Sequence, residues 1–413
     1  MRVLILSNTP FLPATAGNCA RIARMVEYLT GAGHEVAMCM LPDADTPSWD
    51  VAGMRARLAW LEIGAAPSSL VASVARRTLG GLGRLVRRRA DAGPRSIGVD
   101  DWCPGWFRAR ARAHVREWQP DVVLVEYVFL SACLEGLDAP PRCVTVIDTH
   151  DLMHRRQAAY AALGMPPQWF HTTWAEERRG LLRADLVLAI HAEDAAVLRA
   201  MIPERRVLTV PHAHPMHAAP PGAAAAGRLL FVASFNDLNV RGLEWLLDAV
   251  WPALRRAVPG VELVVCGTIA AKLGTLPPGV VARGFVADLT AEYGAARVVV
   301  SPARGGTGLK VKVIEALCHG RPIVTTRASA TGLDTGETTG VLVADDAEAF
   351  TAALVALLGD DARWRRLASA AAAHAARRYT PEAVFASMVA AWEHERAAPR
   401  SAAPGGVAPA TPA

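Results

Sequence analysis

The sequence predicts an α/β protein built from two doubly wound domains, and three observations lead to that prediction. Short apolar runs alternate with amphipathic segments in two successive blocks, which is typical of parallel sheets covered by helices. A segment rich in Pro, Ala and Gly, residues 211–227, separates the blocks and is interpreted as a linker. The chain has 413 residues, of which 52% are hydrophobic, and this is enough for two complete cores.

The first block opens with a strand, a helix and a second strand. Arg2–Ser7 is the first apolar run, and His34–Met40 is the second. Between them, Cys19–Thr30 carries apolar residues at helical spacing. The loop before this helix contains Gly17, and in a βαβ unit such a loop lies at the edge of the sheet where ligands bind.

Further strands are predicted downstream in the first block, at Asp121–Tyr127, Val144–Ile147 and Arg206–Val210, and Ala184–Ile190 is a further apolar segment. Residues 45–115 give no clear elements. Within them, apolar residues alternate with seven arginines: Arg76, Arg77, Arg84, Arg87, Arg88, Arg89 and Arg95. The segment Arg76–Arg95 is interpreted either as a basic helix lying on anionic lipid or as a solvated face. No aromatic residues are interleaved, which argues against nucleic acid.

The second block repeats the alternation. Strands are predicted at Arg228–Ala233, Val261–Cys266, Val280–Phe285, Arg297–Val300, Ile323–Thr326 and Val341–Ala344. Helices are predicted at Val240–Val258, Asp288–Ala296, Leu309–His319, Ala347–Leu358, Ala362–Arg378 and Pro381–Glu395. The predicted domains are therefore 1–213 and 228–380, and the acid-free tail 399–413 is expected to be disordered.

The most informative stretch is residues 301–326, which read as strand, glycine loop, helix and strand. The loop holds Gly305, Gly306 and Gly308, and a glycine loop that opens a helix is suited to phosphate. The chain has only three lysines, and two of them, Lys310 and Lys312, lie at this junction. A compact ammonium is not equivalent to arginine at a tight phosphate site. The alternative is chance placement on a solvated turn.

This stretch resembles the donor-binding signature of retaining glycosyltransferases of the GT-B fold, family 4. The matching residues are Gly306-Thr307-Gly308, then Lys312-Val313-Ile314-Glu315-Ala316-Leu317, then Gly320-Arg321-Pro322-Ile323-Val324. The resemblance implies two Rossmann-like domains that face a central cleft, with an acceptor-side N-terminal domain onto which 381–398 cross back. It also implies that Glu315 binds the ribose hydroxyls of a nucleotide sugar, which suits a carboxylate because it can accept from both hydroxyls.

The resemblance assigns further residues to the donor. Lys310, Lys312 and the backbone of Gly306, Thr307, Gly308 and Leu309 are expected at the diphosphate, together with Arg241 of the pair Arg241-Gly242. Two positions depart from the usual pattern. Thr307 stands where many relatives have a glutamate that contacts the sugar, and Asn236 stands where a second arginine is usual. The identity of the sugar is therefore left open.

Two residues of the first block complete the expected site. His150 follows the strand Val144–Ile147, and relatives carry a His-Asp pair there, near the donor sugar and the acceptor. The alternative for His150 is a loop histidine that caps a helix. Gly17 matches the turn that approaches the donor phosphates, although an ordinary strand–helix turn would look the same.

The composition limits which partners, which cellular compartment and which cofactors are expected. The net charge of +5 suits anionic substrates or a membrane surface and is too small to indicate nucleic acid. The seven cysteines form no CxxC pair, so we expect free thiols in a reducing compartment and a cytoplasmic protein, with peripheral membrane contact through Arg76–Arg95 left open. No cofactor is implied. His212, His214 and His217 have no nearby carboxylate or cysteine in the sequence, so no metal site is predicted.

The function predicted is transfer of a sugar from a nucleotide sugar to an acceptor hydroxyl, in polysaccharide or glycolipid assembly. His150, Arg241 and Lys312 are the predicted catalytic residues. The acceptor would be a sugar, a lipid-linked sugar or a small molecule. Three alternatives stay open: a GT-B epimerase or hydrolase, a nucleotide-sugar-binding protein with a decayed site, and a membrane- or nucleic-acid-binding module driven by the arginines.

Overall fold

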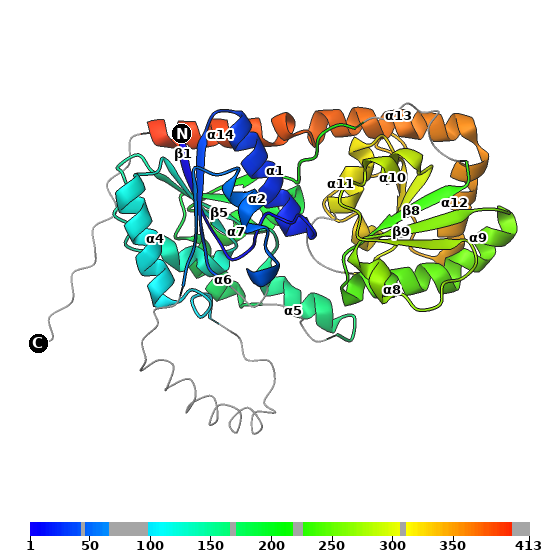
Figure 1. The fold of residues 1–413 in the computed structure, drawn as a ribbon, viewed down its shortest axis with the longest axis horizontal. Helices are drawn as coiled ribbons and strands as arrows, with labels where there is room; N and C mark the ends of the chain where they lie inside the picture. The colour runs from blue at the N-terminus through cyan, green and yellow to red at the C-terminus, as the bar shows by residue number, and fades with distance from the viewer. Residues whose placement is uncertain (43–45, 66–97, 166–170, 218–225, 306–310, 399–413) are drawn as a thin grey trace, which may run out of the picture.

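The computed structural model describes residues 1–42, 46–65, 98–165, 171–217, 226–305 and 311–398. Several predicted features fall outside these ranges: the basic segment Arg76–Arg95, the glycine loop 306–310 and the tail 399–413. Within the described ranges the chain forms two parallel sheets, each covered by helices on both faces (Figure 1). The two-sheet α/β prediction is confirmed.

The N-terminal sheet has seven parallel strands in the order β3-β2-β1-β4-β5-β6-β7. The strands are β1 (Arg2–Ser7), β2 (Glu35–Met40), β3 (Trp60–Ile63), β4 (Val122–Glu126), β5 (Val144–Asp148), β6 (Leu186–Ala189) and β7 (Arg206–Thr209). The helices are α1 (Gly17–Gly31), α2 (Val51–Arg55), α4 (Gly105–Trp118), α5 (Met153–Ala161), α6 (Trp174–Leu181) and α7 (Ala192–Met201), with short 3₁₀ turns η1 (Thr46–Ser48) and η2 (Val128–Leu134).

The C-terminal sheet has six parallel strands in the order β10-β9-β8-β11-β12-β13. They are β8 (Arg228–Val232), β9 (Glu262–Cys266), β10 (Val280–Gly284), β11 (Val298–Ser301), β12 (Ile323–Thr325) and β13 (Val341–Val343). The helices are α8 (Asp237–Trp245), α9 (Trp251–Ala257), α10 (Thr290–Ala295), α11 (Val311–Cys318), α12 (Ala347–Gly359), α13 (Asp361–Arg378) and α14 (Pro381–Ala397). A π-helical turn, η4 (Leu246–Val250), joins α8 to α9, and η5 (Thr268–Lys272) and η6 (Arg327–Ser329) are short 3₁₀ turns.

Strand β1 shows why the sheets are buried on both faces. Its side chains alternate, so Val3 and Ile5 pack into one core cluster while Leu4 and Leu6 pack into the other. Parallel strands with helices on both sides therefore read as continuous apolar runs rather than as alternating ones. This is the property that made the central strands predictable.

In both sheets the strand order reverses beside the first strand. β1 lies between β2 and β4, and β8 lies between β9 and β11. Loops that leave the carboxyl ends of such neighbouring strands go to opposite faces, and a crevice forms between them. The two crevices are the expected positions of bound ligands.

The chain passes between the domains twice. The first passage is residues 210–227, of which 218–225 are outside the described ranges. The second lies between α13, on the C-terminal domain, and α14, which runs back across the N-terminal domain (Figure 1). Val384, Phe385 and Trp392 of α14 are buried in the same cluster as Val3 and Ile5. The last helix is thus part of the N-terminal core.

Candidate functional site

A cavity of about 900 Å³ lies between the two domains. The N-terminal domain contributes the loop after β1 and the first turns of α1. The C-terminal domain contributes the loops after β8, β9 and β10 together with α11, and the linker contributes His214 and His217. The cavity therefore joins the two crevices that the strand orders create, and its size suits a ligand of several rings.

Glu315 faces this cavity from α11. The opposite side of α11 packs Val313, Ile314 and Leu317 into the core, and this burial fixes the direction in which the helix presents its polar residues. The hydroxyl of Tyr293 donates to Glu315 Oε2 over 3.0 Å. Burial raises the pKa of Glu315 above its usual value. The carboxylate is thus held in place, and one of its oxygens has a protein donor.

Lys312 lies one turn earlier on α11 and also lines the cavity. Its Nζ donates to Asn239 Oδ1 over 3.0 Å and lies 5.0 Å from the centre of the Phe231 ring. Asn239 belongs to α8 and was missed by the sequence reasoning. Its position in the segment between the first strand of the block and Arg241-Gly242 was the available signal. The structure brings Lys312, Asn239 and Glu315 together.

Asn236, where an arginine is usual, has a structural role instead. Its side chain accepts from the N–H of Asn239 over 2.9 Å and caps the start of α8. Asn and Asp are favoured at this position because their oxygens satisfy a free N–H of the first helical turn. The cap fixes the backbone of Asn239, whose side chain in turn contacts Lys312.

The loop expected to bind phosphate lies outside the described residues, so the placements predicted for Gly306, Thr307, Gly308, Leu309 and Lys310 stay predictions. The residue before the loop is described. A Cβ added at Gly305 would lie 2.4 Å from Leu163 Cδ1 of the N-terminal domain. The loop therefore begins where the two domains touch.

Gly17 lines the cavity at the first residue of α1. A Cβ at this position would lie 3.1 Å from Val311 Cγ2, at the first residue of α11. Two helix starts from different domains thus meet there. The absence of a side chain allows this approach, which is the property that the sequence analysis expected of a turn beside a donor.

Arg241 is exposed and does not line the cavity. Its Nη1 donates to the backbone oxygen of Leu163 over 2.9 Å, so it connects α8 to the loop after α5. The structure thus places Arg241 at a contact between the domains, outside the cavity wall to which Lys312 and Glu315 belong. Its predicted role at the diphosphate stays a prediction.

His150 is buried and likewise is not part of the cavity wall. Its backbone has φ of 54°, in the left-handed region that is uncommon for residues other than glycine. Its Nε2 lies 2.5 Å from Glu126 Oε2, and its ring stacks on Tyr127 with centroids 4.2 Å apart. The structure therefore holds His150 from two sides, and its predicted role near the sugar stays a prediction.

A buried ion pair lies beside His150. Arg21 of α1 donates from Nε and Nη2 to the two carboxylate oxygens of Asp148, over 2.7 and 3.0 Å. Burial opposes ionisation of Asp148, but the guanidinium holds the pKa of this carboxyl below its usual value. Arg21 Nη1 also donates to the backbone oxygen of Pro211 over 2.8 Å. The pair therefore connects α1, β5 and the start of the linker.

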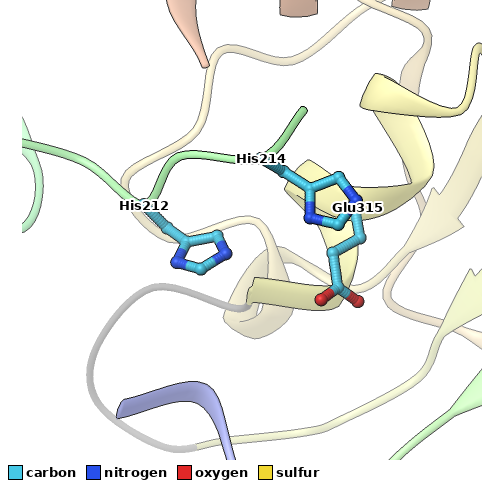
Figure 2. Close-up of side chains that lie close together, drawn as sticks. All are labelled: His212, His214 and Glu315. Carbon is cyan, nitrogen blue, oxygen red and sulfur yellow. The ribbon is translucent and has the colours of Figure 1, made fainter. Parts of the chain in front are cut away.

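The linker histidines are arranged in a way that the sequence did not indicate. His212, His214 and Glu315 each offer a ligand atom within 4.8 Å of the others (Figure 2). No carboxylate lies near these histidines in the sequence, but the structure places Glu315 beside two of them. Glu315 is remote in the chain but close in space because the linker crosses the face of α11. His217 is not part of this group and stacks on His319 instead, with centroids 4.9 Å apart.

All seven cysteines are buried, and none of them forms a disulfide. Among the described residues, none of the helices has both the length and the apolar character needed to cross a membrane. The prediction of membrane contact concerned Arg76–Arg95, which lie outside these residues.

Comparison with known proteins agrees with this geometry. Residues 226–360 match the family model described as Glycosyl transferases group 1, and this match lies wholly within the C-terminal domain. A phosphatidyl-myo-inositol mannosyltransferase from Mycobacterium leprae (strain TN) is 29% identical over 174 residues, which are 40% of this chain and 46% of that protein. The alignment thus spans less than half of the length of this relative.

Solved structures resemble the chain over nearly its whole length. A TarM mutant from S. aureus, in complex with fondaparinux, alpha-GlcNAc-glycerol and UDP, superposes with a TM-score of 0.68 at 8% identity, covering 96% of this chain and all of that one. Sucrose-phosphate synthase from Thermosynechococcus elongatus gives 0.67 at 17% identity, with 95% and 99% covered. Anabaena HepE with UDP and glucose gives 0.65 at 14% identity, with 95% and 100% covered. The chain therefore has the GT-B fold.

Proposed function

We propose that this chain transfers a sugar from a nucleotide-sugar donor to an acceptor hydroxyl, with retention of the anomeric configuration. One observation carries the proposal. Glu315 and Lys312 face the same cavity from one helix, and this helix belongs to the domain that matches the group 1 glycosyl transferases. The cavity lies between two doubly wound domains, where a donor and an acceptor can be bound from opposite sides.

In this proposal Glu315 binds the ribose of the donor. A carboxylate can accept hydrogen bonds from both ribose hydroxyls, and hydrogen bonds to charged groups contribute about 1.5–3 kcal/mol each. Tyr293 donates to one oxygen of Glu315, so the carboxylate has a fixed direction before the donor arrives. Fixing a binding group in advance lowers the entropic cost of binding.

Lys312 is proposed to stabilise the diphosphate leaving group, together with Lys310 and the backbone N–H groups of Gly306, Thr307, Gly308 and Leu309. Arg241 joins them in this proposal when it exchanges its bond to Leu163 for a phosphate oxygen. Positive groups aimed at developing negative charge commonly contribute about 3–4 kcal/mol each to lowering the barrier. These groups would carry the charge that Mg²⁺ carries elsewhere, so we expect turnover without added metal.

The N-terminal domain is proposed to bind the acceptor, with His150 directed by Glu126 toward the reacting sugar. The curated relative is named as a mannosyltransferase, and one of the superposed structures holds UDP and glucose. Hexose donors and lipid-linked or sugar acceptors are therefore the first candidates to test. Assembly of a glycolipid or polysaccharide is the context that we propose.

The first experiment is calorimetric titration of the purified chain with UDP, GDP, ADP and dTDP and with their sugars. We expect micromolar binding of one nucleotide and a loss of at least about tenfold in Glu315→Gln, which removes the charge and keeps the shape. Glu244→Gln is the matched control, since Glu244 is an exposed glutamate on α8 outside the cavity wall. Equal binding by wild type and Glu315→Gln would contradict the proposed ribose contact.

Product analysis then separates the remaining functions. An acceptor-dependent product with the anomeric configuration of the donor supports retaining transfer. Release of free or epimerised sugar without an acceptor would indicate the hydrolase or epimerase instead. Binding without any turnover, over a panel of lipid and sugar acceptors, would indicate a binding protein with a decayed site.

A further inference from the structure

The linker presents two histidines to the carboxylate of Glu315. Residues 210–217 form no helix or strand. The ligand atoms of His212 and His214 lie close together, while Ala213 between them is buried in the N-terminal core. Backbone bonds hold the segment on both sides, because His214 N–H donates to Tyr379 over 2.8 Å and His217 N–H donates to Cys318 over 2.9 Å.

These two histidines have no hydrogen-bond partners among the described residues. His212 is fully buried and His214 is 7% exposed, yet neither ring nitrogen of either side chain makes a hydrogen bond there. A buried polar group without a partner is unfavourable, because it has lost its hydrogen bonds to water. Four such nitrogens in one place, beside a carboxylate, indicate that a ligand belongs there.

The two rings and a carboxylate are the donor groups of this cluster. An imidazole nitrogen that makes no hydrogen bond can offer its lone pair to a cation. Figure 2 shows the two rings beside the carboxylate of Glu315, which supplies the negative charge.

We propose that His212, His214 and Glu315 form a binding site for a zinc-class divalent cation. Two imidazoles, one carboxylate and an open fourth position are a donor set that Zn²⁺ uses in proteins. Imidazole ligands also favour Co²⁺, Ni²⁺ and Cu²⁺ over Mg²⁺ and Ca²⁺. The ligand atoms lie within 4.8 Å of one another, and a tetrahedral site brings them to about 3.4 Å, which side-chain rotations can supply.

Neighbouring side chains orient one of the metal ligands, and others oppose the binding of a cation. Tyr293 donates to Glu315 Oε2 and leaves the other oxygen for the cation, which is the kind of outer contact that orients a metal ligand. Arg24 and Lys312 are the positive charges that act on Glu315, and Arg21 and Arg24 act on His212. These charges weaken cation binding, so we expect a reversible site rather than a permanent structural metal.

The position of the site has a consequence that rests on the proposed function. Glu315 is the carboxylate assigned to the ribose of the donor, and it cannot hold a cation and accept from both hydroxyls with the same oxygens. The cation and the nucleotide should therefore exclude one another. A zinc-class cation would act as an inhibitor at the donor site, and chemistry at the sugar would proceed in its absence.

The test uses the full chain without a histidine tag, freed of metal by a chelator. ZnCl₂ is titrated by calorimetry, and CoCl₂ is titrated in parallel because a tetrahedral site gives Co²⁺ a characteristic visible absorption. We expect one cation per chain. His212→Gln and His214→Gln should each bind at least about tenfold more weakly and lose the absorption. His217→Gln is the matched control, since it is a linker histidine that lines the same cavity outside the group.

Several results would overturn the site. One is failure of both cations to bind to the wild type, and another is undiminished binding to His212→Gln and His214→Gln. Equal weakening of cation binding in His217→Gln would show that a different set of histidines holds the cation, and the proposed site would be wrong. If a histidine variant unfolds in thermal melts, Glu315→Gln takes its place, because Glu315 is partly exposed and its loss should abolish the tetrahedral Co²⁺ absorption while the fold persists.

A second titration separates this inference from the proposed function. The nucleotide that binds best is titrated with and without saturating ZnCl₂, and we expect at least about tenfold weaker binding with zinc. If zinc binds but no nucleotide does, the proposed function fails and the metal site stands. If both bind without competition while Glu315→Gln still weakens the nucleotide, the cation does not use Glu315 and the three-residue site is wrong; if Glu315→Gln leaves the nucleotide unaffected, the proposed ribose contact fails instead.

Discussion

The carboxyl ends of the two sheets differ in what their polar side chains do. In the N-terminal domain they bind one another: Arg21 pairs with Asp148, and His150 contacts Glu126. In the C-terminal domain Lys312 contacts Asn239 and the Phe231 ring, Glu315 accepts from Tyr293, and both side chains line the cavity. Polar side chains near the carboxyl ends of two similar sheets thus have different roles. The first set connects elements of its own domain, and the second set lines the cavity between the domains.

Of the substitutions that test this difference between the domains, replacement of Arg21 should have the largest effect, and the effect should be on stability. Arg21→Met leaves Asp148 buried without its partner, and loss of one member of a buried pair costs about 3–5 kcal/mol. We expect that decrease in the free energy of unfolding, measured by urea denaturation. Arg24→Met, on the same helix, is the control, because its pair with Glu27 is largely exposed and should contribute less than about 1 kcal/mol. A similar loss in both variants would show that burial of the pair is not what matters.

Lys312 tests the other side of the comparison. Lys312→Met removes a charge that faces the cavity. We therefore expect the nucleoside diphosphate to bind about 10–100-fold more weakly, with little change in the stability of the protein. The same variant should bind the matching nucleoside, which has no phosphates, as the wild type does. Both affinities can be measured by calorimetry. Weakening that is equal for the nucleoside and the diphosphate would place the lysine away from the phosphates.

Asp194 provides a contrast to Asp148 within the N-terminal domain, because it is a buried carboxylate whose neighbours include other acidic residues. Burial, with Asp151 next, raises its pKa to about 7. The folded state then binds the proton more tightly than the unfolded state, so the contribution of Asp194 to stability is lost as the pH rises from about 4 through 7.

The variant Asp194→Asn removes that titration. We expect it to raise the free energy of unfolding at pH 8, on the order of 2 kcal/mol relative to its effect at pH 5. Glu193→Gln, an exposed neighbour on α7, should change the pH dependence only slightly, because Glu193 is the weakest of the causes that raise the pKa of Asp194. Chemical denaturation of the three proteins at both pH values measures this. A pH-independent effect of Asp194→Asn would contradict the raised pKa.

Gly17 has the smallest expected effect, and it concerns the approach of the two domains. Gly17→Ala places a methyl group 3.1 Å from Val311 Cγ2, so we expect nucleotide binding to weaken about twofold to fivefold. Gly31→Ala is the control, since a Cβ at the other end of α1 meets nothing within 4 Å. Restoration of affinity in Gly17→Ala combined with Val311→Ala would assign the effect to this contact, and unchanged affinity in Gly17→Ala would exclude it.

Much of the fold followed from the sequence, and the misses have a physical cause. The central strands of both sheets are buried on both faces, so their continuous apolar runs were recognisable. β3 (Trp60–Ile63) was missed because it is a short edge strand whose residues are all half-buried, and it has no such run. The predicted helix Val240–Val258 is interrupted by the π-helical turn Leu246–Val250, and hydrophobic periodicity does not resolve that change.

The candidate site was predicted only where local pattern and spatial position coincide. Glu315 and Lys312 belong to one helix with a recognisable pattern, and both face the cavity. Asn239 was missed because its contact with Lys312 depends on how α8 packs beside α11. The approach of Glu315 to His212 and His214 depends on the path of the linker, which no local pattern contains. Arg241 matched a motif, yet its guanidinium contacts Leu163 in this structure.

The double passage of the chain between the domains has a mechanical consequence. A single connecting segment would let the two domains rotate about any axis, whereas two segments restrict them to rotation about the line that joins these segments. Here the two connecting segments are also hydrogen-bonded to each other, since the N–H of His214 donates to the carbonyl of Tyr379. We expect the two domains to open and close by rotation about one axis, so that α1 and α11 return to the same relative position each time the cleft closes. Distances between spin labels on the two domains, with and without nucleotide, should then change along one arc.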